Sequence, residues 1–91
     1  MNLSRHEYVE PPWTEHQMDA YEQARSLLSE VIAAYSARIA STDAETADQL
    51  RAQRAAHLRE RQSLTAGHTA RVEEIRATLP GILTLLRERD Q

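Results

Sequence analysis

Two residues that can bind metal ions, His57 and Glu60, lie three positions apart in a stretch of strong helix formers. On a helix this spacing places both side chains on one face, where they could reach the same ion. Two ligands are too few for a metal centre, and the chain contains neither a His-Glu-x-x-His nor a Glu-x-x-His pattern. We therefore interpret the two as an exposed pair and expect no metal site and no cofactor.

Catalysis finds little support in the residue types that are present. The chain has no cysteine, which excludes thiolate-bound metals and cysteine nucleophiles, and all its basic residues are arginines, which excludes lysine Schiff bases. Serines, histidines and acids occur, but none lies at a glycine-bearing turn or strand end that would present a nucleophile. We expect no enzymatic activity and no small-molecule substrate.

Three arginines, Arg51, Arg54 and Arg61, lie along the second predicted helix, with Leu58 on the turn between Arg54 and Arg61. They could bind the phosphates of a nucleic acid, but the net charge of −3 and the lack of a stacking aromatic ring in this helix favour a different interpretation. In that interpretation the arginines pair with acidic residues of the antiparallel first helix: Glu15, Asp19, Glu22 and Glu30. An acidic protein partner is the second alternative and a nucleic acid the third.

The most apolar part of the chain is its C-terminal segment, residues 79–86. Four of its side chains recur at helical spacing: Leu79, Ile82, Leu83 and Leu86. They either fill the core or contact another subunit, because the second predicted helix has too few large apolar residues to cover them. An apolar stripe that a short chain cannot cover is typical of a subunit interface, so we predict a protein interface at these four residues.

Residues 1–13 are predicted to form an extended N-terminal arm, because Pro11 and Pro12 fix φ and disfavour helix in the residues before them. Tyr8 and Val9 give this stiff segment an apolar part that a partner protein could bind. Both residues are therefore added to the predicted protein interface.

The domain that follows the arm begins with a clear helix start. Thr14 and Gln17 have the types and spacing of a capping box, and apolar residues then recur at spacings of three and four. A second capping box, Thr42 with Glu45, is predicted to begin the next helix. Because so few residues separate the two helices, they must run antiparallel as a hairpin.

Gly67 decides how many helices the chain forms. As a C-terminal cap it ends the second helix, and Thr69 then caps a third helix. If Gly67 is instead tolerated inside a helix, the second helix continues to Thr78 and extends past the end of the first. The three-helix alternative is preferred, and Pro80 predicts a break within the third helix because proline disfavours helix in the residue before it.

These patterns predict an all-α fold, an antiparallel helical hairpin that a third helical segment extends into a three-helix bundle or a coiled-coil-like hairpin. One helical domain, residues 14–91, holds the expected helices at about 14–40, 43–66 and 69–89, with a break near residue 80. Neither a signal peptide nor a membrane span is visible, so we expect a cytoplasmic protein without a membrane partner. The expected function is a protein–protein interaction or assembly module whose partner is above all another copy of itself. A nucleic-acid-linked regulator is the alternative.

Overall fold

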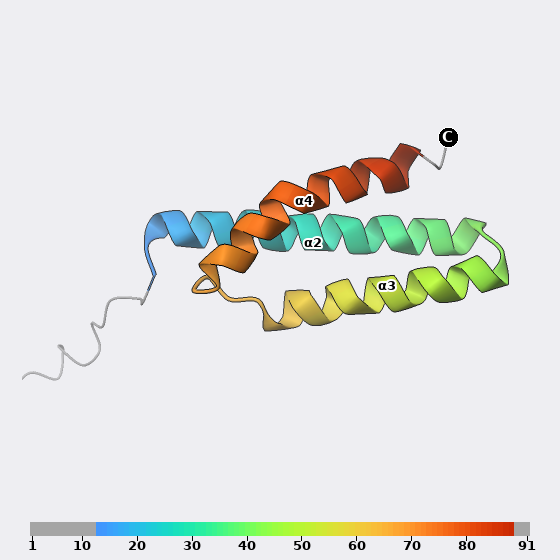
Figure 1. The fold of residues 1–91 in the computed structure, drawn as a ribbon, viewed down its shortest axis with the longest axis horizontal. Coiled ribbons are helices and arrows are strands. Elements are labelled where there is room, and N and C mark those ends of the chain that lie inside the picture. Colours follow the sequence, from blue (N-terminus) through green and yellow to red (C-terminus); the bar gives the residue numbers. More distant parts are fainter. Residues whose placement is uncertain (1–12, 89–91) are drawn as a thin grey trace, which may run out of the picture.

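The computed structural model describes residues 13–88, which form three helices: α2 (Glu15–Ser41), α3 (Ala44–Ser63) and α4 (Thr69–Glu88), as labelled in Figure 1. Helices α2 and α3 run antiparallel as a hairpin, and α4 folds back across α2. The predicted all-α fold, a hairpin extended by a third helical segment, is therefore confirmed. None of the three helices is long and apolar enough to cross a membrane.

A reciprocal pair of hydrogen bonds defines the start of α2. The backbone N–H of Gln17 donates to Thr14 Oγ1 at 3.1 Å, and the backbone N–H of Thr14 donates to Gln17 Oε1 at 2.7 Å. This is the predicted capping box. The side-chain nitrogen of the same Gln17 donates to Thr69 Oγ1 at 3.2 Å. Gln17 therefore also holds the start of α4 beside the start of α2.

The turn between α2 and α3 is capped by a different residue from the one predicted. Asp43 is the N-cap of α3, and its two carboxylate oxygens accept hydrogen bonds from Thr46 N at 2.8 Å and from Thr46 Oγ1 at 3.0 Å. These bonds lower the pKa of the Asp43 carboxyl. The predicted Thr42–Glu45 capping box is wrong, because the aspartate one position later offers a charged acceptor to the same helix end.

The structure decides between the two alternatives for Gly67 in favour of three helices. Helix α3 ends at Ser63 and α4 begins at Thr69, so Gly67 lies in the link between them. Its φ is not positive, whereas a glycine that caps a helix adopts the left-handed conformation. The predicted number of helices is confirmed, but the predicted cap is wrong. Leu64 closes α3 instead, and its N–H donates to the Glu60 carbonyl at 2.9 Å.

Helix α4 continues through Pro80 without the break predicted near residue 80. Pro80 itself is exposed, while Leu79 and Leu83 on either side of it are buried in the core. The packing of these two leucines holds the helix in one piece, although proline cannot donate the backbone hydrogen bond of its position. The predicted break is wrong because tertiary packing outweighs the local preference.

The core lies along α2, which packs against α3 on one side and against α4 on another (Figure 1). The most completely buried large side chains come from α2 and α4: Leu28, Val31, Val72 and Ile75. Helix α3 contributes little to the core, since Ala47 is its one buried residue. Helices α3 and α4 do not pack against each other, and the C-terminal half of α4 diverges from α3. Among the described residues 13–88, one side of α4 is therefore left without a neighbouring helix.

Candidate interaction surfaces

The four predicted interface residues of the C-terminal segment divide into two groups. Leu79 and Leu83 are 3% and 7% exposed and belong to the core. Ile82 and Leu86 are half-buried and lie at the edge of the core. Leu79 and Leu83 are therefore committed to the fold of the single chain, and only Ile82 and Leu86 remain candidates for a contact with a partner.

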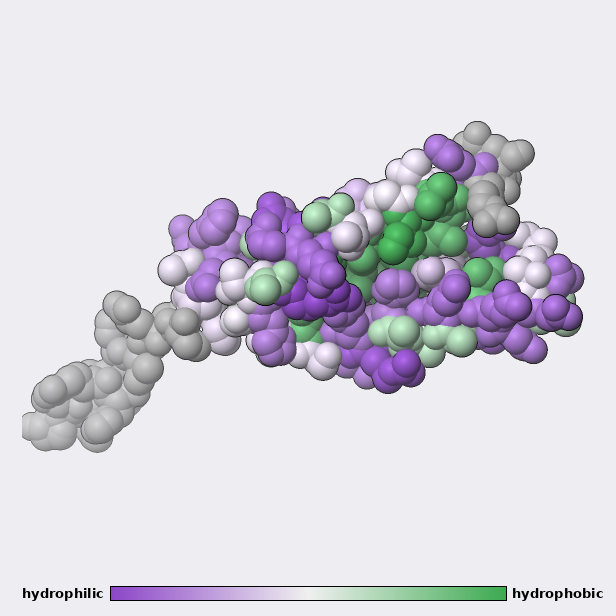
Figure 2. All heavy atoms as spheres, in the orientation of Figure 1, coloured by the Kyte–Doolittle hydropathy of each residue, from purple (hydrophilic) through white to green (hydrophobic). Residues whose placement is uncertain are grey.

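Leu85 is the large apolar side chain that sequence reasoning misses. It is 61% exposed, and no other large apolar residue of residues 13–88 is exposed. Figure 2 shows hydrophobic side chains gathered beside α4, over the hollow between α4 and α3. Ile82 and Leu86 have the spacing of core residues, whereas Leu85 falls on the outer side of the helix. We refer to Ile82, Leu85 and Leu86 as the apolar face of α4.

The part of the helix that carries the apolar face has no charge. Residues 77–86 contain no ionisable side chain, although charged residues make up 27% of the chain. A partner can therefore cover this part of α4 without burying a charge that lacks a counter-charge. The two predicted interface residues of the arm, Tyr8 and Val9, lie outside the described residues.

The arginine row of α3 meets hydroxyl groups instead of the predicted carboxylates. Arg54 Nη1 donates to Ser36 Oγ and Arg61 Nη1 donates to Ser29 Oγ, each at 2.9 Å. Arg51 forms an ion pair within its own helix, at 2.7 Å. The predicted pairing of this row with the acidic residues of α2 is therefore wrong.

The register of α2 explains why the acidic residues are not used. Ser29 and Ser36 lie seven residues apart, so they share the face of α2 that meets α3. The acidic residues of α2 are exposed instead: Glu15, Asp19, Glu22 and Glu30. One of them, Glu30, pairs with Arg87 of α4 at 3.5 Å. Within residues 13–88, Arg54 and Arg61 thus lack an acidic partner.

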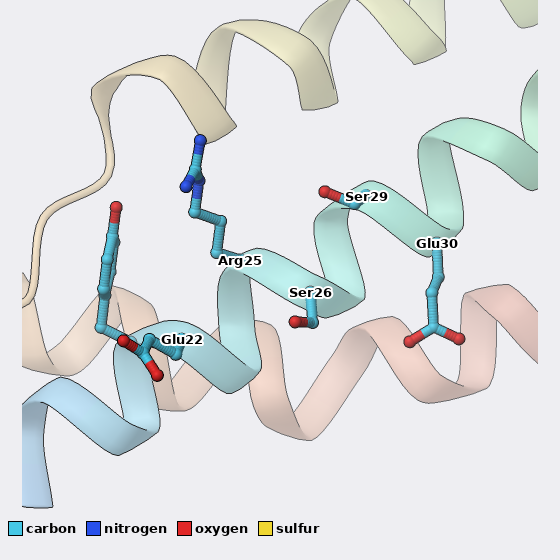
Figure 3. Close-up of a pocket in the computed structure, with 6 residues that line it drawn as sticks. Glu22, Arg25, Ser26, Ser29 and Glu30 are labelled. Atoms are coloured by element: carbon cyan, nitrogen blue, oxygen red, sulfur yellow. The ribbon is translucent and has the colours of Figure 1, made fainter.

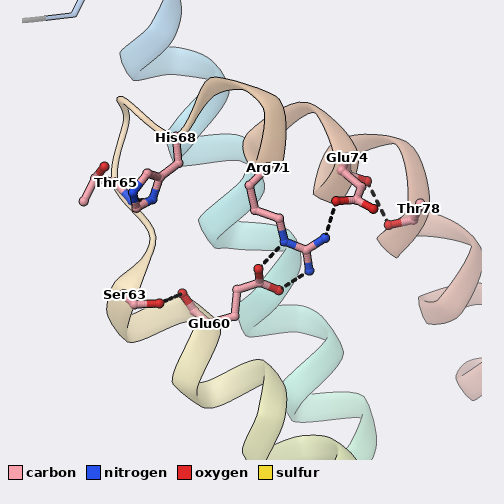
Figure 4. Close-up of polar contacts among 7 residues, drawn as sticks. All are labelled: Glu60, Ser63, Thr65, His68, Arg71, Glu74 and Thr78. Atoms are coloured by element: carbon pink, nitrogen blue, oxygen red, sulfur yellow. Dashed lines mark hydrogen bonds and ion pairs between the residues drawn. The ribbon is translucent and has the colours of Figure 1, made fainter.

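A cluster of charged residues joins α3 to the first half of α4 (Figure 4). Arg71 donates to both carboxylate oxygens of Glu60, from Nε and from Nη2, and its Nη1 donates to Glu74 Oε1 at 2.6 Å. The bidentate pair lowers the pKa of the Glu60 carboxyl and raises the pKa of the Arg71 guanidinium. This pair therefore connects two helices that do not otherwise pack against each other.

His57 lies one helical turn before Glu60 and is half-buried rather than exposed. Its ring stacks on Tyr35 of α2, with the ring centroids 5.5 Å apart. Burial lowers the pKa of His57, the Glu60 carboxylate raises it, and Arg71 lowers it. The prediction of an exposed His–Glu pair is wrong, because both residues take part in helix contacts. Within residues 13–88, no group of three or more His, Asp or Glu side chains could hold a metal ion.

We expect the protein to lose stability in two steps as the pH falls, the upper one through His57 and the lower one through Glu60 and Asp43, because the pKa values of all three groups are lower in the folded chain. Each contribution is fully present above the pKa of the unfolded chain, about 6.5 for His57 and about 4.3 for Glu60, and is lost as the pH falls through the lower folded value. The variant His57→Gln should therefore flatten the loss that begins as the pH falls below about 6.5. Urea unfolding at a series of pH values measures both steps.

Glu60→Gln is the matched control for this experiment. It should flatten the step below about pH 4.3 and leave the upper step at least as steep, because a carboxylate that favours protonation of His57 is gone. A wild-type stability that stays constant as the pH falls below about 6.5, until the carboxyl groups begin to titrate, would contradict this account of His57. So would an upper step that His57→Gln leaves unchanged.

Two hollows of the described surface differ in size and in lining. One hollow, of about 790 Å³, is lined by residues of α2 alone: Tyr21, Glu22, Arg25, Ser26, Ser29 and Glu30. In Figure 3, Arg25 extends toward α3 while Glu30 extends toward α4, where it pairs with Arg87, so these side chains do not converge on one point. A second hollow, between the starts of α2 and α4, measures about 80 Å³, well below the roughly 300 Å³ of a small ligand site.

Two of these surfaces carry groups that have no apolar or oppositely charged partner within residues 13–88. They are the apolar face of α4 and the pair of arginines, Arg54 and Arg61, that are bonded to hydroxyl groups. These two surfaces are the candidates for a contact with a partner.

The chain matches no model of a protein family, no curated protein and no solved structure.

Proposed function

We propose that this chain is a non-catalytic protein–protein interaction module that assembles by burying the apolar face of α4. The observation that carries the proposal is Leu85, which is 61% exposed within a stretch of helix that has no charge. Complete burial of a leucine side chain contributes about 1.5–3 kcal/mol relative to its exposure to water. Ile82 and Leu86, which are half-buried, would lose further contact with water in the same contact.

The size of the chain supports self-association as the mode of assembly. A domain of 91 residues buries a smaller fraction of its surface than a larger domain does, and here α3 adds one buried residue to the core. A helix of a partner that lies along the apolar face would cover the side of α4 that has no neighbour. Oligomerisation is a common way in which small domains add buried area.

We expect the wild type to be a defined oligomer by light scattering on a sizing column, and Leu85→Glu to be a folded monomer. In the assembly the new carboxylate would be buried without a counter-charge, whereas in the monomer it stays in water and leaves the fold intact. The dissociation constant should rise by about tenfold or more, which corresponds to about 1.4 kcal/mol. Circular dichroism of the variant verifies that the helices are retained.

Ala33→Glu is the matched control, because Ala33 is exposed on α2 and the variant adds the same charge away from α4. It should keep the mass of the wild type. A wild type that is monomeric at every concentration contradicts the proposal, as does a Leu85→Glu variant that keeps the wild-type mass.

A nucleic-acid-linked role is the second candidate, and the arginine row is the observation that favours it. Arg54 and Arg61 each use Nη1 to bind a serine, which leaves further guanidinium N–H groups for an anion. The net charge of −3 opposes a long-range attraction to phosphates. Binding of duplex DNA that weakens steeply with salt and disappears in the double variant Arg54→Gln, Arg61→Gln would support this role.

A further inference from the structure

Gly81 stands in the middle of α4, although the single chain does not require a glycine there. Its φ is not positive, and a Cβ atom placed on it would meet no other atom within 4 Å. Glycine is less favourable inside a helix than every residue except proline, so almost any side chain at this position would strengthen α4. Gly81 is also exposed, so its missing side chain leaves a depression on the surface of the helix.

Leu85 lies one helical turn after Gly81, on the same face of α4. Ala77 lies one turn before Gly81 on that face, so a projecting side chain follows two short ones. The helix therefore carries a projection and a depression side by side. Packed helices interlock through this kind of pairing, in which a side chain of one helix fits between the residues of the other.

We infer that the partner of the proposed assembly is a second copy of this chain, in a two-fold dimer in which Leu85 packs into the depression at the partner's Gly81. A two-fold axis requires that every contact occur twice, with the roles of the two subunits exchanged. A projection and a depression one turn apart on one face meet this requirement when the two α4 helices run antiparallel. The inference rests on the proposed function and adds the two-fold symmetry of the assembly and the geometry of the contact.

The distribution of charge supports a second α4 as the occupant. Many exposed positions of α2 and α3 are charged, and any such surface placed on residues 77–86 would bury a charge without a counter-charge. Within the described residues, the apolar face of α4 is both apolar and uncharged. A second copy of this face can therefore cover the first without burying a charge. A two-fold contact is closed, so the dimer leaves no further copy of this face to continue the assembly.

The length of the contact determines the affinity to expect. Residues 77–86 span about 15 Å of helix axis at about 1.5 Å per residue. A contact along one helix of this length buries less than the roughly 800 Å² per partner that is typical of stable complexes. We therefore expect a dimer that forms at micromolar concentrations and dissociates on dilution into folded monomers.

The first test fills the depression with Gly81→Leu. The melting temperature of the monomer, measured well below the dissociation constant, should rise by a few degrees, because leucine favours helix and enters open space. The dissociation constant of the dimer should rise by about tenfold or more, because the new side chain occupies the place of the partner's Leu85. A general loss of folding cannot produce these opposite effects. Ala33→Leu, on the exposed side of α2, is the control and should leave the dissociation constant unchanged.

The second test uses cysteines to find the register, because the chain has none of its own. A mixture of Gly81→Cys and Leu85→Cys copies should give the mixed disulfide in preference to either homodimer, and Ala33→Cys should not cross-link. An oligomer that Leu85→Glu dissociates, but that tolerates Gly81→Leu and forms no mixed disulfide, would overturn this inference and leave the proposed function intact. A wild type that light scattering finds monomeric at all concentrations would overturn both.

Discussion

Truncation of Ile75 to alanine is expected to lower the free energy of unfolding by about 2–5 kcal/mol. Ile75 is 0% exposed and belongs to the core cluster that joins α4 to α2. The variant loses the burial of the removed methyl and methylene groups and leaves a cavity that neighbouring side chains fill only in part. A domain of this length has a total free energy of unfolding of roughly 5–14 kcal/mol, so this substitution removes a large share of it.

Leu85→Ala is the matched control, since it truncates an aliphatic side chain of the same helix at a position that is 61% exposed. In dilute, monomeric protein it should change the free energy of unfolding by less than about 0.5 kcal/mol. Urea unfolding followed by circular dichroism measures both variants at one concentration. Equal losses in the two variants would mean that α4 does not pack on α2 through the face described above.

Local chemistry explains the parts of the fold that the sequence predicts correctly. The capping box at the start of α2 depends on two side chains, Thr14 and Gln17, and on the backbone between them, so it needs no information from the rest of the chain. The hairpin is equally local, because the short turn after α2 permits only an antiparallel neighbour.

The errors occur where two local preferences compete or where packing decides. Thr42 and Asp43 are both suitable N-caps, and in the structure Asp43 caps α3, with both carboxylate oxygens accepting hydrogen bonds from Thr46. At Pro80 the local preference favours a break, but Leu79 and Leu83 are buried on either side and keep the helix whole. Such a balance of packing against propensity cannot be read from residue types alone.

The candidate surfaces are harder to predict than the fold, because they depend on how each helix is rotated about its own axis. The spacing of Leu79 and Leu83 is the same whether they pack into their own chain or into a partner. Residue types alone also leave open which side of α4 lacks a neighbour, and this absence is what exposes Leu85.

One signal in the sequence could have located the contact between α2 and α3. Ser29 and Ser36 are seven residues apart, and so are Arg54 and Arg61. Equal spacing on two antiparallel helices lets both pairs meet at once, which the structure shows as two hydrogen bonds of 2.9 Å. The acidic residues of α2 attract attention because of their charge, but they are exposed, and Arg54 and Arg61 bond with the serines instead.

Replacement of Pro80 by alanine is expected to raise the free energy of unfolding by about 1–3 kcal/mol. Alanine supplies the backbone N–H that proline lacks, and this group can donate to the carbonyl of Arg76 one turn earlier. It also removes the ring that crowds that carbonyl. Because Pro80 is exposed, the core contacts of Leu79 and Leu83 remain. Urea unfolding of monomeric protein measures the gain.

Thr84→Ala is the control, an exposed substitution one turn later that adds no backbone donor and should stay within about 0.5 kcal/mol of the wild type. A gain confined to Pro80→Ala means that the core leucines hold α4 together against the proline. An unchanged or lower stability would contradict the continuous helix and favour the break near residue 80.

Pro80 lies on the side of α4 away from Leu85, so Pro80→Ala should leave the dissociation constant of the dimer unchanged. Gly81→Leu raises that constant, so the two adjacent positions separate the stability of α4 from its role in assembly.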